Sequence, residues 1–294
     1  MNKIVRLEDI FGCSAAKPKL SAPKLPDRIA LGMPHLSANG LSEGWLLKEL
    51  GHRHWFLLAE AAGMAVPDFR TASGEPVYAA FRAVSLSGCD LASACENDVL
   101  TLSSSLEPLS RTQVSSRHRL TIAGRPIGTI ELLSTFVKRD VGGGNHTVAR
   151  IAVDGLSPKR TQAPANGIAA RAAAFRSAPA AELARFTFDP CPSQDFNGAG
   201  FLYFTSFLAL VDRAEWQFDR ACALTATTAS RDIFYRGNID PGETVAVALL
   251  AHRTTTDGVA HHCRLLRVTD GAIIADVFSV RARTSDRHDR HPIQ

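Results

Sequence analysis

Residues 193–204, SQDFNGAGFLYF, combine an acid, an amide and two glycines directly ahead of an apolar run. Glycines at the start of a helix let a carbonyl oxygen approach backbone N–H groups, and the positive end of the helix dipole favours negative charge on that oxygen. Asn197 would donate to a tetrahedral oxyanion or an enolate, and Asp195 would act as a base. The string therefore predicts cofactor-free chemistry at a carbonyl group. The residues expected to bind the substrate are Gly198, Gly200, Tyr203, Ser206 and Trp45.

The same string has a structural interpretation. Asp and Asn are preferred residues for capping a helix N-terminus, so Asp195 and Asn197 could simply begin the helix that follows. For Asn197 alone the two interpretations are balanced, whereas the whole string favours a functional site.

Two similar sets of elements are expected to position these residues. The apolar spacing in residues 40–63 predicts a helix over about 42–62, with Ser42 at its start and Gly63 after its end, although Gly51 in the middle costs about 1 kcal/mol relative to alanine. Residues 196–218 predict a second helix over about 199–218. Each helix precedes four short runs rich in Val, Ile, Leu, Thr and Phe that predict antiparallel strands.

This order of elements occurs twice. In each half the last two predicted strands form a hairpin with glycine at the turn. Duplication at about half the chain length predicts an α+β fold, a tandem or double hot-dog with two antiparallel sheets each wrapped around one long helix, the sheets joined into one. The alternative is a generic α+β protein whose halves are similar by accident.

The expected domain boundaries follow the changes in composition. Residues 1–27, with AAKPKLSAPKLPDR, predict a flexible leader, and residues 28–141 the first hot-dog. Residues 142–184, with GGGNH and an alanine-rich stretch, predict a linker with a short helix. Residues 185–283 are the second hot-dog, and the RHDRH-containing residues 284–294 predict a disordered tail.

Composition excludes several classes of protein. The net charge is only +4, with basic and acidic residues interleaved, so a nucleic-acid binder is not expected. The chain lacks both an apolar run of about 20 residues and a secretion signal, which predicts a cytoplasmic protein with no membrane partner. The six cysteines are scattered without a CxxC pair, and His261 and His262 point to opposite faces of a predicted strand, so no metal site is expected. The run His52, Arg53, His54 is typical of a solvated helix face.

The string at 193–204 resembles the thioesterase-type hot-dog signature, in which an acid, an Asn-Gly turn and an aromatic precede the helix. Asp195, Asn197, Gly198 and Tyr203 match that pattern. Ala199 stands where a histidine usually follows the glycine, and this departure argues against ordinary thioester hydrolysis.

Nearly all of the chain after the leader resembles a narrower family, the bifunctional acyltransferase/decarboxylase of leinamycin biosynthesis and its relatives in polyketide gene clusters. The resemblance is carried by LGMPHLSANGLSEGWLLKELGHRHW (31–55), EPVYAAFRAV (75–84), DFNGAGFLYFTSF (195–207) and SRDIFYRGNIDPGETV (230–245). It implies a double hot-dog that takes methylmalonyl from coenzyme A onto a tyrosine, passes it to an acyl carrier protein and decarboxylates it to a propionyl thioester. The LGHRHW string in the first helix departs from the family and suggests a sister branch with another acyl group.

The resemblance implies that Tyr78 is the nucleophile, since its surroundings match the tyrosine-bearing strand of that family best. The other two tyrosines are Tyr203 and Tyr235. A phenol is a poor nucleophile at neutral pH, so a base or positive neighbours must activate it, and His35 in GMPHL is the candidate. The structural alternatives are a core tyrosine for Tyr78 and a turn or capping histidine for His35.

Three functions stay open on the sequence. The first is transfer of a malonyl- or methylmalonyl-type group from coenzyme A to an acyl carrier protein with decarboxylation. The second is a dehydratase or thioesterase of the same fold, with Asp195 as base, and the third is a non-catalytic acyl-carrier binding protein. Each implies acyl-CoA or a carrier protein as partner, with phosphopantetheine as substrate carrier and no bound cofactor. Because the two halves would pair within one chain, a monomer or weak homodimer is expected.

Overall fold

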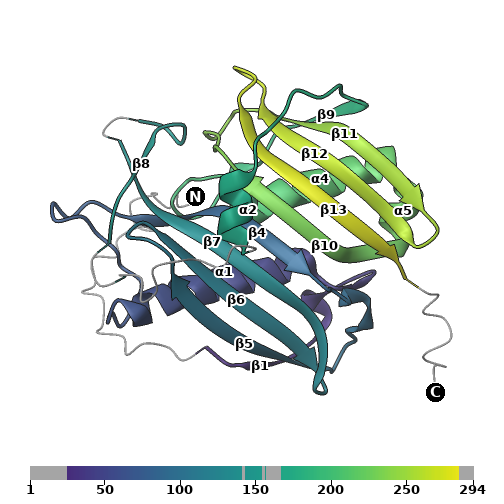
Figure 1. Ribbon diagram of the computed structural model, residues 1–294, viewed down its shortest axis with the longest axis horizontal. Coiled ribbons are helices and arrows are strands. Elements are labelled where there is room, and N and C mark those ends of the chain that lie inside the picture. Colours follow the sequence, from purple (N-terminus) through teal and green to yellow (C-terminus); the bar gives the residue numbers. More distant parts are fainter. Residues whose placement is uncertain (1–24, 141–142, 154–155, 157–166, 285–294) are drawn as a thin grey trace, which may run out of the picture.

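A single antiparallel sheet of eleven strands forms the centre of the computed structural model, which describes residues 25–140, 143–153, 156 and 167–284 (Figure 1). The strands lie in the order β1-β5-β6-β7-β4-β10-β13-β12-β11-β9, with β8 beside β7. Their bounds are β1 (Arg28–Ala30), β4 (Tyr78–Ser87), β5 (Val99–Pro108), β6 (Gln113–Ile122), β7 (Arg125–Arg139), β8 (Val148–Arg150), β9 (Ala184–Phe188), β10 (Ala226–Tyr235), β11 (Val245–Thr255), β12 (Gly258–Arg267) and β13 (Ile273–Arg283).

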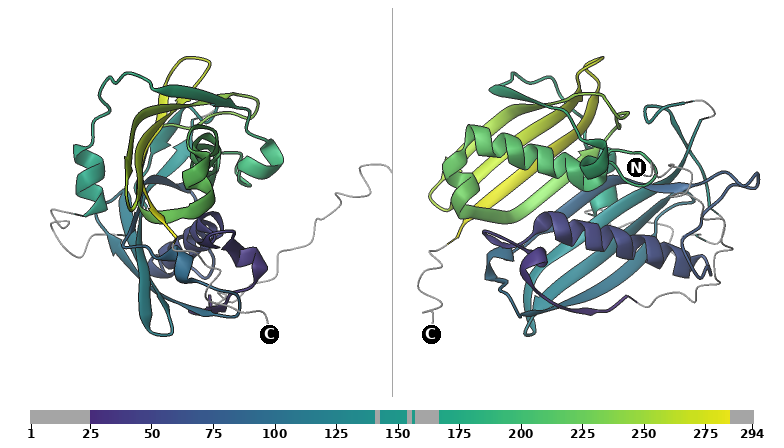
Figure 2. Two further views of the ribbon diagram at one scale, coloured as in Figure 1. Left: turned by 90° about the vertical axis from the view of Figure 1, so that its right-hand side faces the viewer. Right: turned by 180° about the vertical axis from the view of Figure 1, so that it is seen from behind.

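Two long helices lie against one face of this sheet (Figure 2). They are α1 (Glu43–Ala61) and α4 (Phe204–Phe218), while α2 (Ile168–Ala174) packs on the opposite face against β4 and β7. The predicted start of α1 is confirmed, because the Ser42 hydroxyl accepts the Trp45 N–H at 3.3 Å. The smaller elements are η2 (Met33–His35), β2 (Leu36–Ser37), β3 (Gly40–Leu41), η3 (Leu91–Ser93), α3 (Pro192–Asp195) and α5 (Arg220–Thr225).

The two halves repeat the same topology. Outward from the centre, the strands after α1 lie in the order β4, β7, β6, β5, and those after α4 lie in the order β10, β13, β12, β11. The halves join where β4 pairs with β10, with Val84 opposite Ile233. Of the expected linker, α2 and β8 are described, and most of the predicted leader and tail lies outside the described residues. Within the described part of the chain, no helix has the length and apolarity needed to cross a bilayer.

The second helix begins later than predicted. Residues 197–203 form a loop, with Gly200 at φ +76°, and α4 starts only at Phe204. The Asn197 side chain closes this loop by accepting the N–H groups of Ala199 and Phe201, so the backbone cannot turn helically there.

The main apolar core lies between the helices and the sheet and extends across both halves. Gly51, which was expected to weaken α1, lies instead where the helices approach each other closely. A Cβ atom at this position would be 2.8 Å from Cε1 of Phe204, so only glycine fits without displacing that ring.

We expect Gly51→Ala to lower the free energy of unfolding by about 1–3 kcal/mol through overpacking, despite the better helix propensity of alanine. At Gly44 in the same helix, nothing lies within 4 Å of the position that a Cβ atom would take, so Gly44→Ala should raise stability by up to about 1 kcal/mol. Urea unfolding of both variants checks this, and equal stabilisation by both would contradict the packing role of Gly51.

A buried network of side-chain hydrogen bonds connects α1 to the sheet. His54 on α1 binds the hydroxyls of Ser116 and Ser134, each at 2.7 Å, and Ser116 binds His118 at 2.9 Å. Burial lowers the pKa of both His54 and His118 to about 3, so both imidazoles are neutral. The prediction of a solvated face is therefore wrong for His54 and also for Arg53, which is buried and pairs with Glu49.

Because of these two neutral histidines, the free energy of unfolding should decrease as the pH is lowered. A histidine near pKa 6.5 in the unfolded chain and near 3 in the folded protein contributes stability above pH 6.5 that is lost progressively towards pH 3. Each contributes a slope of at most about 1.4 kcal/mol per pH unit in that window. In urea unfolding between pH 4 and 7, His54→Gln should make the free energy of unfolding less dependent on pH, by the equivalent of about one bound proton. Replacing the exposed His52 should leave this dependence unchanged. An unchanged slope in His54→Gln would contradict the assignment.

Candidate active site

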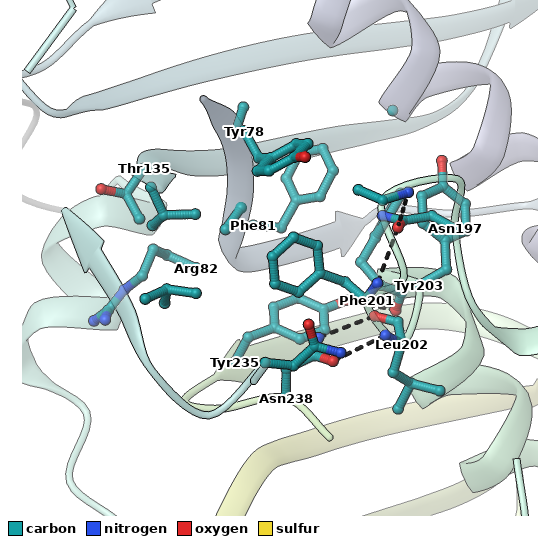
Figure 3. Close-up of a pocket in the computed structure, with 18 of the residues that line it drawn as sticks. Tyr78, Phe81, Arg82, Thr135, Asn197, Phe201, Leu202, Tyr203, Tyr235 and Asn238 are labelled. Carbon is teal, nitrogen blue, oxygen red and sulfur yellow. Dashed lines mark hydrogen bonds between the residues drawn. The ribbon is translucent and has the colours of Figure 1, made fainter. Parts of the chain in front are cut away.

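A cavity of about 740 Å³ lies between the two halves (Figure 3). Strands β4 and β10 pair only from Ala83 to Leu86 on the β4 side. Among the strands that the structure describes, none pairs with the earlier part of β4 on that side. The cavity lies there, between β4, the middle of α1 and the loop 197–203. Its walls are largely aromatic and aliphatic, and they include Phe81, Phe201, Leu202, Phe204 and Phe207.

Asn197 organises the loop on one side of this cavity. Its Oδ1 accepts the N–H groups of Ala199 at 3.0 Å and Phe201 at 3.1 Å, and its backbone carbonyl accepts the N–H of Gly200 at 2.8 Å. The N–H groups of Ala199, Gly200 and Phe201 are therefore used within the loop itself. Among the described residues, no acceptor binds the Asn197 Nδ2 amide or the Gly198 N–H, so these two groups are the donors that the loop can offer to a ligand.

Two residues that precede the second half of the chain help to hold the loop in place. Arg139, at the end of β7, donates from Nη2 to the carbonyl of Ala199 and lies 4.2 Å over the Phe201 ring. Asn145 is buried, and its Nδ2 donates to the carbonyl of Gly200 at 2.6 Å. Within its own half, the loop is also held by Asn238, whose side chain binds both backbone groups of Leu202.

Tyr78 is the first residue of β4 and lines the cavity from the opposite side. Its ring makes an edge contact with Phe201 at 5.5 Å between centroids. Figure 3 shows the Tyr78 hydroxyl directed across the cavity toward the side that carries Asn197. Within the described residues, the Tyr78 hydroxyl has no hydrogen-bond partner, so it is free to meet a ligand.

The other two tyrosines also line the cavity but are differently engaged. The Tyr235 hydroxyl donates to the carbonyl of Phe204 at 3.0 Å, and burial raises its pKa well above the usual value. Burial also raises the pKa of Tyr203, which directly precedes α4. A raised phenol pKa makes phenolate formation harder at Tyr203 and Tyr235.

The remaining candidate residues do not line the cavity. Asp195 is buried, its carboxylate accepts the N–H of Cys191 at 2.8 Å, and its backbone carbonyl accepts the Ser206 hydroxyl at 2.9 Å. The side chains of Asp195 and Ser206 thus stabilise the start of the loop 197–203, and Gly200 provides its left-handed backbone conformation.

The candidates His35 and Trp45 lie away from the cavity. His35 accepts the N–H of Gly32 at 2.8 Å and contacts the Trp45 ring. This pair lies at the start of α1, about six residues or roughly 9 Å along the helix from Gly51.

Sequence reasoning missed several residues that line the cavity. His52, His54 and His146 supply imidazoles, and Arg82, Arg150 and Arg236 supply positive charge. The only carboxylate in the described lining is Asp68, which pairs with Arg70 at 3.0 Å. No spacing in the sequence brings these residues together, because strand pairing and the β4–β10 junction do so.

One group of side chains consists of residue types that can bind a metal ion. His146, Asp240 and Glu243 place their ligand atoms within 4.8 Å of one another. Each is already engaged: the imidazole binds Glu243 at 2.6 Å, and Asp240 accepts the N–H of Asn145 at 2.8 Å. These contacts account for the cluster as an ordinary hydrogen-bonded network.

Comparison with known proteins relates the chain to others by structure. No protein-family model and no curated protein sequence matches it. The structure is similar to an acyl-ACP thioesterase from Bacteroides thetaiotaomicron, with a TM-score of 0.61 over 86% of this chain and 96% of that chain, at 11% identity. It is also similar to the 12:0-ACP thioesterase from Umbellularia californica, with a TM-score of 0.62 over 87% of this chain and 96% of that chain, at 9% identity.

These similarities extend over both halves and most of the other two chains. The protein therefore has the hot-dog fold of these thioesterases. At such low identity the likeness concerns the fold, and the chemistry has to be argued from the cavity.

Proposed function

We propose that this chain is a tandem hot-dog enzyme that transfers a malonyl- or methylmalonyl-type group from coenzyme A to an acyl carrier protein, with decarboxylation. The observation that carries the proposal is the position of Tyr78 and Asn197 in the lining of one cavity between the halves. The solved thioesterases of similar fold support acyl-thioester chemistry as the general class.

In the proposed first step the Tyr78 oxygen attacks the thioester carbonyl. A C–O bond forms, the C–S bond breaks, and the phenolic proton passes through a base to the departing thiolate. In the second step the carrier thiol attacks the aryl ester, and Tyr78 recovers its proton. His52 and His146 are candidates for the base, since both line the cavity, whereas His35 ends η2 and packs against Trp45.

Decarboxylation requires a carboxylate in a poorly solvated pocket and donors at the thioester oxygen. The C–C bond breaks, carbon dioxide leaves, and the electron pair forms an enolate that is then protonated on carbon. The aromatic lining around Phe81 and Phe207 disfavours hydration of the carboxylate, and the free Asn197 amide would stabilise the enolate oxygen.

Hydrolysis is the second candidate, and the fold comparisons favour it over transfer because the similar structures are thioesterases. The cavity supports transfer through the Tyr78 hydroxyl that it contains, whereas Asp195, the base expected for hydrolysis, is engaged outside the lining. A dehydratase would need a comparable base. A non-catalytic carrier-binding protein would need only the apolar walls.

Product analysis separates these candidates. The protein is mixed with methylmalonyl-coenzyme A and a holo carrier protein, and the acyl products are followed by mass spectrometry. We expect propionyl-loaded carrier protein and free coenzyme A. Free acid as the main product would replace transfer by hydrolysis, and binding without any conversion would favour the non-catalytic alternative.

A further inference from the structure

Three arginines gather in the lining of the cavity. Arg82 is on β4, Arg150 ends β8, and Arg236 follows β10. Within the described residues, Arg82 and Arg150 make no ion pair. Arg236 has one carboxylate partner there, Asp276 at 3.7 Å, and also donates to the Phe175 carbonyl at 3.5 Å and lies over the Phe175 ring. Asp276 already binds Arg264 and His262, at 2.9 and 2.8 Å, so it offers Arg236 little neutralisation.

Arg82, a lining residue of the cavity, lies at an irregularity in its strand. The pairing of β4 with β7 shifts between Phe81 and Ala83, so Arg82 is the extra residue of a β-bulge. Bulges are a common device for re-aiming a side chain beside a functional site. The Nε of Arg82 is buried and has no hydrogen-bond partner among the described residues. An unpaired buried donor is costly, and a bound anion would satisfy it.

Strand register places Arg150 on the same face as Tyr78. Val137 of β7 pairs with Tyr78 on one side and with Arg150 on the other, and directly paired residues share a face of the sheet. Two strand spacings, roughly 10 Å, separate the two backbones. Burial lowers the pKa of Arg82, and the charges of Arg150 and Arg236 lower it further, so the three cations repel one another. Such a cluster is stabilised by an anion between them.

We infer that Arg82, Arg150 and Arg236 form an anion site for the phosphate at the far end of a phosphopantetheine arm. This assignment rests on the proposed function. In Figure 3, Arg82 lies on the side of the cavity away from Asn197. The carboxylate of a malonyl group must stay close to its own thioester carbonyl, and therefore close to Asn197 and Tyr78. The anion at the arginine end is accordingly the distant phosphate.

Binding of unacylated probes tests the site directly. We expect the wild-type chain to bind phosphopantetheine at least about tenfold more tightly than pantetheine in calorimetric titrations, and R82Q and R150Q to remove this preference. R125Q is the matched control, because Arg125 is exposed, pairs with Asp90 and does not line the cavity, and it should keep the preference. Equal affinities in the wild type, or a preference that survives R82Q, would overturn the inference.

Two further probes identify the anion. Coenzyme A and a holo carrier protein carry this same phosphate, so R82Q should weaken the binding of both by about tenfold. If R82Q weakens the binding of coenzyme A alone, the arginines bind the nucleotide phosphates instead, and the inference is overturned. If the wild type binds malonyl-pantetheine more tightly than acetyl-pantetheine and R82Q removes this preference, the arginines bind the acyl carboxylate. That result would also overturn the inference.

The proposed function and the anion site can fail separately. A wild-type chain that prefers phosphopantetheine but leaves acyl-coenzyme A unchanged would refute the enzyme and support the site. An active chain that converts acyl-pantetheine and acyl-phosphopantetheine with equal KM would support the enzyme and refute the site.

Discussion

Replacing Tyr78 with phenylalanine should abolish acyl transfer while leaving the fold intact. The change removes one oxygen that has no hydrogen-bond partner among the described residues, and the edge contact of the ring with Phe201 is kept. Loss of a covalent nucleophile should lower kcat by about 10³-fold or more. Transfer of the acyl group to the carrier protein measures the effect, and circular dichroism with urea unfolding verifies the fold.

Tyr235→Phe is the matched control, since Tyr235 lines the same cavity and donates its hydroxyl to the backbone at Phe204. It should lose about 1 kcal/mol of stability through the missing hydrogen bond and keep its transfer activity. Full activity in Tyr78→Phe would remove Tyr78 from the mechanism.

Asn197→Asp should lower the kcat of acyl transfer by about 10²- to 10³-fold, which corresponds to an activation barrier higher by about 3 kcal/mol. Aspartate keeps the oxygen that accepts the N–H groups of Ala199 and Phe201, so the loop should stay closed. It replaces the free Nδ2 donor by a second acceptor, which repels an oxyanion. The kcat of the variant against a malonyl- or methylmalonyl-type thioester is the measurement.

Asn197→Ala separates the two roles of this residue. Alanine removes both the donor and the loop-closing oxygen, so it should lose activity and also unfold at lower urea concentration than Asn197→Asp. If Asn197→Asp keeps full activity and only Asn197→Ala fails, Asn197 is a loop-closing residue and the oxyanion role is refuted.

Much of the fold was predictable because its signals are local. The apolar spacing and the serine cap fixed the start of α1, and alternating apolar runs predicted the strands of both halves. The start of α4 was placed too early because side-chain capping by Asn197, which holds residues 197–203 as a loop, competes with helix formation. The burial of His54 was missed because its serine partners come from β6 and β7, far away in the sequence.

The candidate site was predictable only in part. Asn197 and Gly198 share a string that suggests chemistry, and Tyr78 came from a resemblance; both lines of reasoning lead to one cavity. His35 and Trp45 lie elsewhere because the segment before α1 packs against the start of that helix. The arginines could not be found in advance, since a β-bulge at Arg82 and the pairing of β8 with β7 bring them together.

The most direct test of the account is the location of the acyl group after a single turnover without carrier protein. The tryptic peptide 71–82, TASGEPVYAAFR, contains Tyr78 and no other tyrosine. After mixing with methylmalonyl-coenzyme A, we expect an acyl mass increment on Tyr78 of this peptide, which disappears on addition of a holo carrier protein. Product formation with no increment on Tyr78, or an increment on another residue, would contradict it.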